Sequence, residues 1–211
     1  VLPRLGHNYV YTDLSDGTHS GVCTACGKTT TPEPHVYEGS NLCTLCGSVS
    51  APILDESVVI HHTLDLLSDI SIHYVVDVAS LTAYDSFYLE CELPRYDGTL
   101  LISYDTVVVQ PTLRGSYYYF TLDGITAPQM GDTVRSVLYM KNESGSYCSS
   151  ADLYSVSAYA YSQLSKDAPY ALKVLCAELL RYGSAAQIYK AYRTDSLVDS
   201  AMTSEHRAYL C

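Results

Sequence analysis

Four of the eight cysteines fall into two closely spaced pairs that could bind a metal ion. Cys23 and Cys26 form one Cys-x-x-Cys pair, Cys43 and Cys46 form the other, and sixteen residues separate the pairs. Two intervening residues let both thiolates of a pair face one tetrahedral ion, and this spacing is typical of a zinc ribbon. A glycine follows each pair and permits the positive-φ turn that such a knuckle needs. The pattern predicts a structural zinc site, with a pair of disulfides as the alternative.

Three histidines near the cysteine pairs compete as ligands. In the simplest arrangement, the four cysteines alone hold one ion. In the other, the histidines on either side of the first pair complete its site, and the ligands are His19, Cys23, Cys26 and His35. The second pair then recruits His7 or another group, and a second zinc ion takes part. Four protein ligands leave no position for a water molecule, so a structural role is expected in both cases.

An internal repeat connects the histidines with the cysteine pairs. Each unit reads His-x-Tyr, a spacer and Cys-x-x-Cys-Gly; the units begin at His7 and His35, and the first has the longer spacer. This coincidence favours a ligand role for the histidines. Residues 1–52 contain few aliphatic side chains, and segments this small usually depend on disulfides or metals for stability. We therefore expect residues 1–52 to form a small zinc-ribbon-like module.

The apolar pattern of residues 53–150 predicts an antiparallel β-sandwich. Short runs rich in β-branched or alternating apolar residues are separated by turns containing Gly, Asp and Asn, as in all-β sandwiches. The predicted strands are 70–76, 86–93, 99–109, 116–122, 133–140 and 146–151. Residues 78–84 fit this pattern less well, and we expect a short helical turn there.

From Asp152 the apolar spacing changes to three and four, which predicts helices over 151–211. The first helix would bury Leu153, Val156, Ala160 and Leu164. The second would start at an Asp167 cap, with Pro169 in its first turn, and a third short helix would follow Thr203. The expected stripe of the second helix is Leu172, Leu175, Leu179, Tyr182, Ala186 and Tyr189, with Gly183 allowing close packing. Because the helices follow the strands, the fold class is α+β, with a C-terminal helical hairpin.

The remaining cysteines and histidines read as ordinary packing residues. His61, His62 and His73 lie in strand-like sequence, and adjacent strand residues face opposite ways, so the first two cannot easily share an ion. Cys91 and Cys148 lie in the predicted sheet, where they could approach each other. Buried free thiols are the default for them and for Cys176.

Charge argues against a nucleic-acid partner. The net charge is −11, and residues 53–149 contribute −9 of it, so the middle of the chain repels phosphate. No run approaches the roughly 20 apolar residues that span a bilayer, and no signal-peptide pattern begins the sequence.

No motif of a known catalytic centre is present, and we expect no enzyme activity. The paired carboxylates Glu90/Glu92 and Asp55/Glu56 could in principle serve a hydrolase, but on an acidic sheet they indicate solvation. Tyrosine is the unusual component: there are 21 Tyr, two Phe and no Trp. Among the residues 117–119, all tyrosines, alternation exposes at least one ring, which could bind a carbohydrate.

The His-x-Tyr and Cys-x-x-Cys-Gly units resemble short repeats of secreted or surface-anchored multimodular proteins of clostridial gut bacteria. The stretch Leu-Leu-Arg-Tyr-Gly-Ser-Ala-Ala-Gln at 179–187 is similar to a Leu-Leu-x-Tyr-Gly-Ala-Ala-Ala-Gln signature of those proteins, and Ser184 is its one departure. A sandwich like that expected here accompanies the signature. The resemblance implies an extracellular or cell-surface location and a non-catalytic role, and it brings no known activity.

Three functions are compatible with these observations. The first is a non-catalytic surface module with a structural zinc, acting as a scaffold or binding a protein or glycan ligand. The second is a carbohydrate-binding module that uses surface tyrosines such as Tyr117, Tyr118 and Tyr119. The third is a hydrolase with an acidic site.

Overall fold

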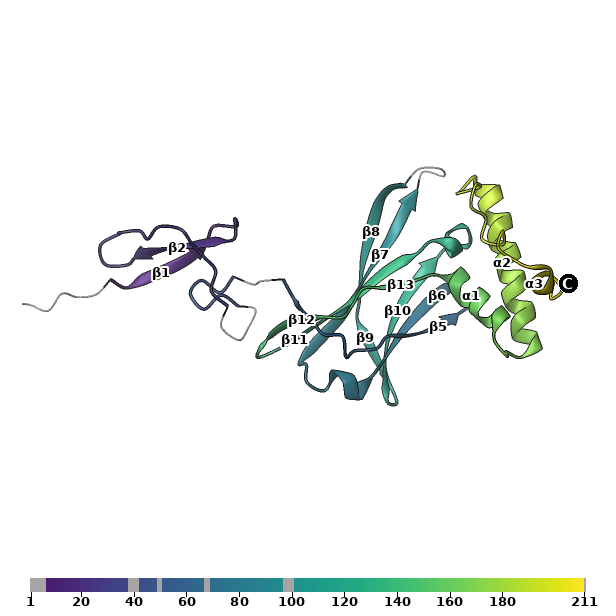
Figure 1. Ribbon diagram of the computed structural model, residues 1–211, viewed down its shortest axis with the longest axis horizontal. Coiled ribbons are helices and arrows are strands. Elements are labelled where there is room, and N and C mark those ends of the chain that lie inside the picture. Colours follow the sequence, from purple (N-terminus) through teal and green to yellow (C-terminus); the bar gives the residue numbers. More distant parts are fainter. Residues whose placement is uncertain (1–6, 38–41, 49–50, 67–68, 97–100, 211) are drawn as a thin grey trace, which may run out of the picture.

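The structure is a computed structural model that describes residues 7–37, 42–48, 51–66, 69–96 and 101–210. Within them the protein is mostly β-structure, arranged in three sheets with a few helices, which agrees with the α+β class. In Figure 1 an N-terminal hairpin lies at one end, the two larger sheets occupy the middle and the helices pack at the other end.

The N-terminal sheet consists of β1 (Tyr9–Asp13), β2 (Thr18–Cys23) and the two-residue β3 (Glu33–Pro34). Strands β1 and β2 form an antiparallel hairpin in which Tyr9 pairs with Cys23 and Asp13 with His19. Strand β3 then pairs with the start of β2, with Glu33 opposite His19. These two registers decide which potential metal ligands meet.

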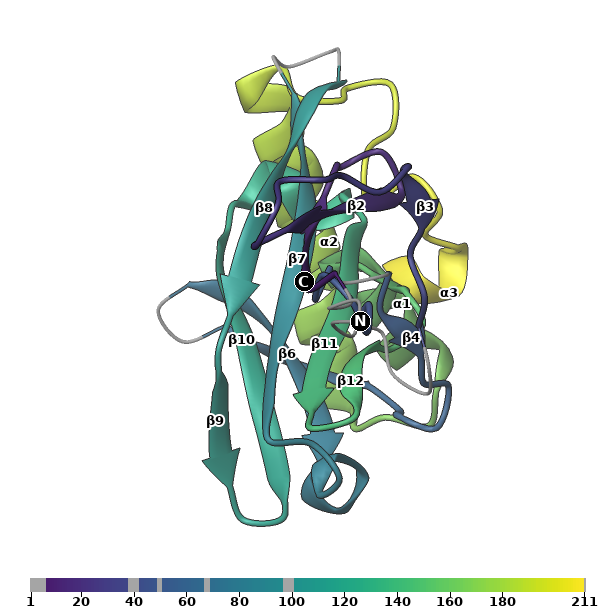
Figure 2. The same cartoon turned by 90° about the vertical axis from the view of Figure 1, so that its left-hand side faces the viewer.

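Two further sheets form the sandwich. One has the order β5-β6-β10-β9, and its strands are β5 (His61–Asp65), β6 (Ile70–Asp77), β10 (Tyr117–Ile125) and β9 (Pro111–Arg114). The other has the order β4-β12-β11-β7-β8, and β13 also pairs with β11. Its strands are β4 (Ile53–Leu54), β7 (Ser86–Tyr96), β8 (Leu101–Val109), β11 (Val134–Asn142), β12 (Gly145–Cys148) and β13 (Asp152–Tyr154). Figure 2 shows both sheets from the end that carries the N-terminal hairpin.

Alternating side chains of both sheets fill the core between them. Ile72, Tyr74 and Val76 project inward from β6, and Leu89 and Cys91 project from β7; all five are almost fully buried. The sequence predicted strands at 70–76, from its β-branched residues, and at 86–93, from its period of two. The predicted turn at 78–84 is also present, as the 3₁₀ helix η1 (Val78–Leu81).

Some strand boundaries differ from the prediction. The predicted strand 146–151 ends early, because β12 stops at Cys148 and residues 149–151 belong to no strand. The chain then forms β13, which pairs with the other end of β11. The predicted start of strand 99–109 lies outside the described residues. Leu153 belongs to β13 and is 66% exposed, so it does not join the buried face of the first helix.

The helices pack at one end of the sandwich. They are the 3₁₀ helix η2 (Ala127–Gly131), α1 (Val156–Ser165), α2 (Tyr170–Lys190) and α3 (Ser204–Arg207). As predicted, Val156, Ala160 and Leu164 are the buried side chains of α1, and α3 starts directly after its Thr203 cap. In Figure 1 α2 lies on the outer side of α1.

The predicted start of α2 was wrong, and its packing face was predicted only in part, since Leu172 and Leu179 do pack against the core. The helix begins at Tyr170 without a side-chain cap, because Pro169 keeps an extended ψ of 142° and Asp167 therefore lies outside the helix. Its buried face consists of Cys176, Ala177, Leu180, Gly183, Ser184 and Gln187, whereas Leu175, Tyr182 and Tyr189 are exposed. Close packing explains why this face of α2 is buried: a Cβ at Gly183 would lie 2.7 Å from a Val198 methyl and 3.0 Å from Met130 Cε.

Candidate metal centres

The predicted ligands of the N-terminal segment form two separate clusters. His19, His35, Cys43 and Cys46 form one, and His7, Cys23 and Cys26 form the other; within each, the potential ligand atoms lie within 4.8 Å of one another. We call them the four-donor site and the three-donor site. Their residues lie on or near β1 and β2, which Figure 1 labels, and β3, which Figure 2 labels.

Donor atoms of the four-donor site are spaced as around a tetrahedral ion. The Nδ1 atoms of His19 and His35 are 3.3 Å apart, His19 Nδ1 lies 3.5 Å from Cys43 Sγ, and His35 Nδ1 lies 3.3 Å from Cys46 Sγ. In a tetrahedral zinc site, bonds of about 2.0 Å to nitrogen and 2.3 Å to sulfur separate two nitrogens by about 3.3 Å and a nitrogen from a sulfur by about 3.5 Å. The three observed separations therefore match those around a tetrahedral zinc ion.

Contacts behind the ligands orient both histidines. His35 Nε2 lies 3.3 Å from Asp13 Oδ1, and Asp13 also accepts hydrogen bonds from the Ser15 amide and the Ser48 hydroxyl. The Ser15 N–H, and then the Ser48 hydroxyl, lower the pKa of Asp13, so it is a carboxylate at neutral pH. A carboxylate on the second ring nitrogen is the usual partner of a metal-bound histidine.

His19 is held by packing. It is fully buried on β2, and the ring of Tyr11 meets its ring edge-on with centroids 5.2 Å apart. Gly21 makes room for that tyrosine, because a Cβ there would lie 3.0 Å from the Tyr11 ring. Among the described residues, the buried Nε2 of His19 has no hydrogen-bond partner. Packing rather than a polar contact thus turns Nδ1 toward the other donors.

The three-donor site has similar spacing but is more open. Cys26 Sγ lies 3.4 Å from His7 Nδ1, again close to the separation expected around zinc. Cys23 is buried, whereas His7 and Cys26 are exposed. In the part of the chain that the structure describes, this cluster has no fourth ligand.

Both cysteine pairs form the same knuckle. Gly27 and Gly47 adopt φ values of 70° and 72°, and each donates its N–H to the carbonyl of the first cysteine at 2.9 Å. Backbone N–H groups also point at the first thiol. Those of Ala25 and Cys26, with His7, lower the pKa of Cys23 to about 6. Burial raises the pKa of Cys43, but the N–H groups of Cys46 and Leu45, with His35, outweigh it and bring the value to about 5.

The second thiol of the four-donor site behaves differently. Burial, and then the adjacent Cys43, raise the pKa of Cys46. Two thiolates this close repel each other unless a cation lies between them. Metal binding requires both cysteines to be deprotonated, so a bound cation would remove this conflict.

The grouping of ligands differs from both arrangements drawn from the sequence. The cysteine pairs belong to different clusters, and His19 and His35 lie with the second pair rather than the first. Strand register is the reason. Pairing of Tyr9 with Cys23 brings His7 to the first knuckle, and pairing of His19 with Glu33 brings His19 beside His35.

Outside the two clusters, His62, His73 and Cys91 have structural partners. His62 Nε2 lies 2.8 Å from Asp152 and its ring stacks on Tyr154, while His73 Nδ1 lies 2.8 Å from the Thr121 hydroxyl. Cys91 contacts Ser136 on β11, and β11 lies between β7 and β12, which separates Cys91 from Cys148. Cys91, Cys148 and Cys176 are free thiols.

One carboxylate of each acidic pair considered for a hydrolase has a structural contact. Glu92 lies 3.3 Å from Arg135 on the neighbouring strand. Asp55 accepts hydrogen bonds from Ser57 and from the hydroxyl of Tyr84, and these contacts lower the pKa of Asp55. Their geometry matches ordinary strand and loop contacts.

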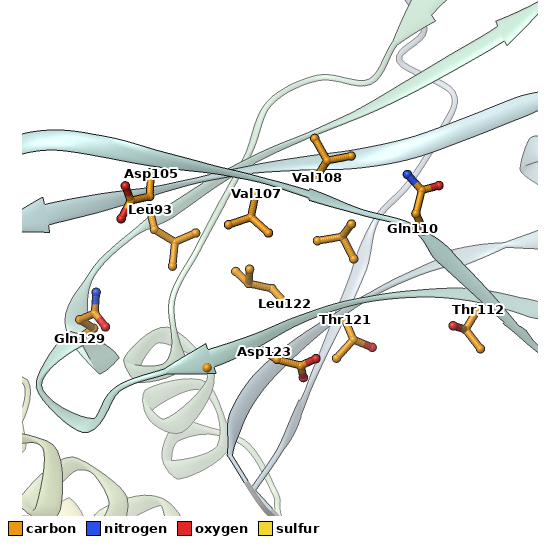
Figure 3. Close-up of a pocket in the computed structure, with 12 residues that line it drawn as sticks. Leu93, Asp105, Val107, Val108, Gln110, Thr112, Thr121, Leu122, Asp123 and Gln129 are labelled. Carbon is orange, nitrogen blue, oxygen red and sulfur yellow. The ribbon is translucent and has the colours of Figure 1, made fainter.

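A cleft of about 640 Å³ lies along β8 and β10, where aliphatic side chains meet short polar ones (Figure 3). Val107 and Leu122 project into it, and its polar groups are Asp105, Gln110, Thr112, Thr121, Asp123 and Gln129. Asp105 is paired with Arg95 at 2.7 Å, and Asp123 accepts a hydrogen bond from Ser71. No aromatic ring is among the described residues that line this cleft.

Tyrosines line a second hollow, of about 320 Å³, on the six-stranded sheet. Tyr88 and Tyr139 stack there with centroids 5.4 Å apart and rings 23° from parallel, and Tyr147 and Lys141 complete the wall. The predicted tyrosines at 117–119 behave differently. Tyr118 packs on Phe87 and the Tyr119 ring is covered by Arg114, whereas Tyr117 is 43% exposed.

Among the described residues, no helix combines the length and apolar character needed to cross a membrane. No family model matches the chain, and no curated protein matches it. A solved structure titled "Crystal structure of Br derivative BhCBM56" is similar to part of it, with 12% identity, a TM-score of 0.29 and coverage of 46% of this chain and 90% of that chain. A TM-score this low assigns neither a family nor a ligand to this protein.

Proposed function

We propose that this protein is a non-catalytic binding or scaffold module whose N-terminal segment is held in shape by zinc. The observation that carries the proposal is the convergence of two Nδ1 and two Sγ atoms, 3.3–3.5 Å apart where they are nearest, in the four-donor site. Four protein ligands fill the coordination of zinc, which is the signature of a structural site rather than a catalytic one. A zinc ion in the three-donor site would likewise stabilise the N-terminal segment.

The composition of the segment explains why it needs metal. Among its described apolar side chains only Cys23 and Cys43 are buried, while Val10, Leu14, Val22, Val36, Leu42 and Leu45 are exposed. A segment without an aliphatic core cannot offset the entropy of ordering its backbone. Zinc binding supplies that free energy in small metal-dependent modules, where binding and folding are one event.

The proposed setting is extracellular or on the cell surface, with a protein or glycan as the partner and no nucleic acid. It is supported by the resemblance of the repeat units to those of clostridial surface proteins and by the net charge of −9 over residues 53–149. In this view the sandwich is the binding or spacing element.

Zinc analysis combined with thiol labelling tests this proposal. Protein purified without added zinc is expected to contain about two equivalents, one for each cluster. Iodoacetamide treatment should label four more cysteines after a chelator is added, namely Cys23, Cys26, Cys43 and Cys46. Cys91 and Cys176 serve as internal controls: burial raises the pKa of each to about 11, so they should react only after denaturation.

Two results would contradict the zinc proposal. Metal-free protein whose mass is four hydrogens lower would establish two disulfides. Metal-free protein with four thiols that react at once would establish that the clusters do not bind metal.

A second candidate function is glycan binding on the tyrosine hollow. Stacked Tyr88 and Tyr139 offer flat apolar faces beside polar groups such as Lys141, and sugar rings have the same amphipathic character. Tyr88 is 37% exposed and its hydroxyphenyl ring is within reach of a ligand.

Affinity electrophoresis in gels containing xylan, β-glucan or mannan tests the second candidate. If one polysaccharide retards the protein, Tyr88→Ala should abolish most of the retardation. Tyr117→Ala, which removes an exposed tyrosine from another strand, should leave it unchanged. Retardation that survives Tyr88→Ala, or no retardation in any gel, would count against this candidate.

A further inference from the structure

Among the described residues, the three-donor site offers a metal ion one ligand fewer than the four-donor site does. His7, Cys23 and Cys26 converge with a nitrogen–sulfur distance of 3.4 Å, yet a tetrahedral zinc ion needs a fourth donor. The site is open to solvent at His7 and Cys26, whereas His19 and Cys43 of the four-donor site are 0% and 3% exposed. Residues 1–6, Val-Leu-Pro-Arg-Leu-Gly, include no side chain that commonly binds zinc.

The two repeat units correspond contact by contact. In the first, the Thr24 N–H donates to the carbonyl of Asn8 at 3.0 Å; in the second, the Thr44 N–H donates to the carbonyl of Val36 at 3.0 Å. Asn8 and Val36 are the middle residues of the two His-x-Tyr motifs.

The aromatic contacts agree as well. The histidine and tyrosine rings of the two motifs lie 5.5 Å apart at 40° in the first unit and 5.9 Å apart at 43° in the second. His7, Cys23 and Cys26 are therefore the structural counterparts of His35, Cys43 and Cys46.

The fourth ligand of the complete site comes from a neighbouring unit. His35, Cys43 and Cys46 belong to the second repeat, but His19 belongs to strand β2 of the first. The long spacer of the first unit forms most of the β1–β2 hairpin. This hairpin places His19 of the first unit in the metal site of the second unit. The complete site is thus a junction between consecutive units.

We infer that the three-donor site binds zinc with one position open, and that this position accepts the imidazole of a histidine on the hairpin of another such unit. The inference rests on the proposed zinc function and extends it from internal stabilisation to the joining of units. The resulting ligand set, two cysteines and two histidines, would equal that of the complete site. A second copy of this chain cannot supply His19 without giving up its own four-donor site, so the donor is a further unit.

Cadmium NMR of the full chain tests the inference. After exchange of zinc for ¹¹³Cd, two resonances are expected, and His7→Ala should remove or strongly shift one of them. Added free imidazole should shift that resonance and leave the other unchanged. A peptide with the sequence of residues 14–22, which contains His19, should do the same at lower concentration than a peptide with His19→Ala.

The outcomes separate this inference from the proposed function. Two resonances that both ignore imidazole would show that neither site has an open position and would overturn the inference, although zinc binding would stand. A single resonance that survives His7→Ala would show that the three-donor cluster binds no metal, with the same consequence. Equal effects of the two peptides would overturn the assignment of the donor to the hairpin histidine. Absence of any cadmium resonance would refute the proposed function itself.

Discussion

Replacement of Cys43 and Cys46 together by serine is expected to remove one equivalent of zinc and unfold the segment 7–48. The double variant leaves only the two histidines of the four-donor site, and hydroxyl groups are poor substitutes for thiolates on zinc. Structural zinc contributes about 10–16 kcal/mol to folding in small zinc modules at neutral pH. Among the described residues this segment has no aliphatic core that could offset such a loss.

The loss of zinc should not unfold the sandwich. Among the described residues, the core between its sheets starts at Val58 and contains no side chain from 7–37 or 42–48. In a ¹H–¹⁵N correlation spectrum, we expect the amide signals of residues 7–48 to collapse into the random-coil range while those of β6, β7, β10 and β11 keep their positions.

A matched control separates loss of a ligand from loss of a thiol. Cys148→Ser makes the same chemical change at a half-buried cysteine outside both clusters, and it should leave zinc content and spectrum unchanged. Dispersed signals for residues 7–48 in a zinc-depleted double variant would show that the segment folds without metal, and our account of its stability would be wrong.

The membership of the candidate sites could be predicted from sequence, but their grouping could not. Spacing identifies the cysteines, and the His-x-Tyr repeat identifies His7 and His35, because these signals are local. Which histidine meets which cysteine pair depends on the pairings of Tyr9 with Cys23 and of His19 with Glu33. Strand register in such short, polar strands has no hydrophobic pattern to reveal it.

The sandwich could be predicted from sequence because its strands do carry a hydrophobic pattern. Its inner strands place apolar side chains at every second position, since one face of each lies in a core that excludes water, as Ile72, Tyr74 and Val76 show. The face of α2 was misassigned in part because large side chains such as Tyr182 and Tyr189, which are exposed, suggested the buried stripe. The real contact uses small and polar residues: Ser184 donates to Asp199, and Gln187 accepts from the Val198 N–H at 2.8 Å.

The role of Asp132 is also revealed only by the structure, since its sequence context, Met-Gly-Asp, indicates no more than a turn. Its carboxylate is almost fully buried and accepts hydrogen bonds from the Tyr192 hydroxyl and, at 2.8 Å, from Arg193. The Arg193 guanidinium also lies 4.9 Å from the centre of the Tyr96 ring on β7. Asp132 therefore binds the segment after α2 to the sandwich through these hydrogen bonds.

The backbone just after α2 is in an unfavourable conformation that such contacts stabilise. Ala191 and Arg193 have φ values of 50° and 45°, in the left-handed region that costs a residue with a side chain about 1–2 kcal/mol. Conformations of this kind persist only where surrounding contacts hold them. Burial raises the pKa of Asp132, and the hydrogen bonds from Tyr192 and Arg193 oppose this rise.

Asp132→Ala is therefore expected to lower the free energy of unfolding of the sandwich by about 3 kcal/mol, the lower end of the range for breaking a buried ion pair, because Arg193 remains partly solvated. Asp105→Ala is the matched control: it breaks the Asp105–Arg95 pair at a similar distance of 2.7 Å, but both side chains are at least half exposed, so the loss should stay below about 1 kcal/mol. Urea denaturation of both variants measures the difference. Equal losses would show that the contact of Asp132 with Tyr192 and Arg193 contributes no more to stability than an ordinary surface pair.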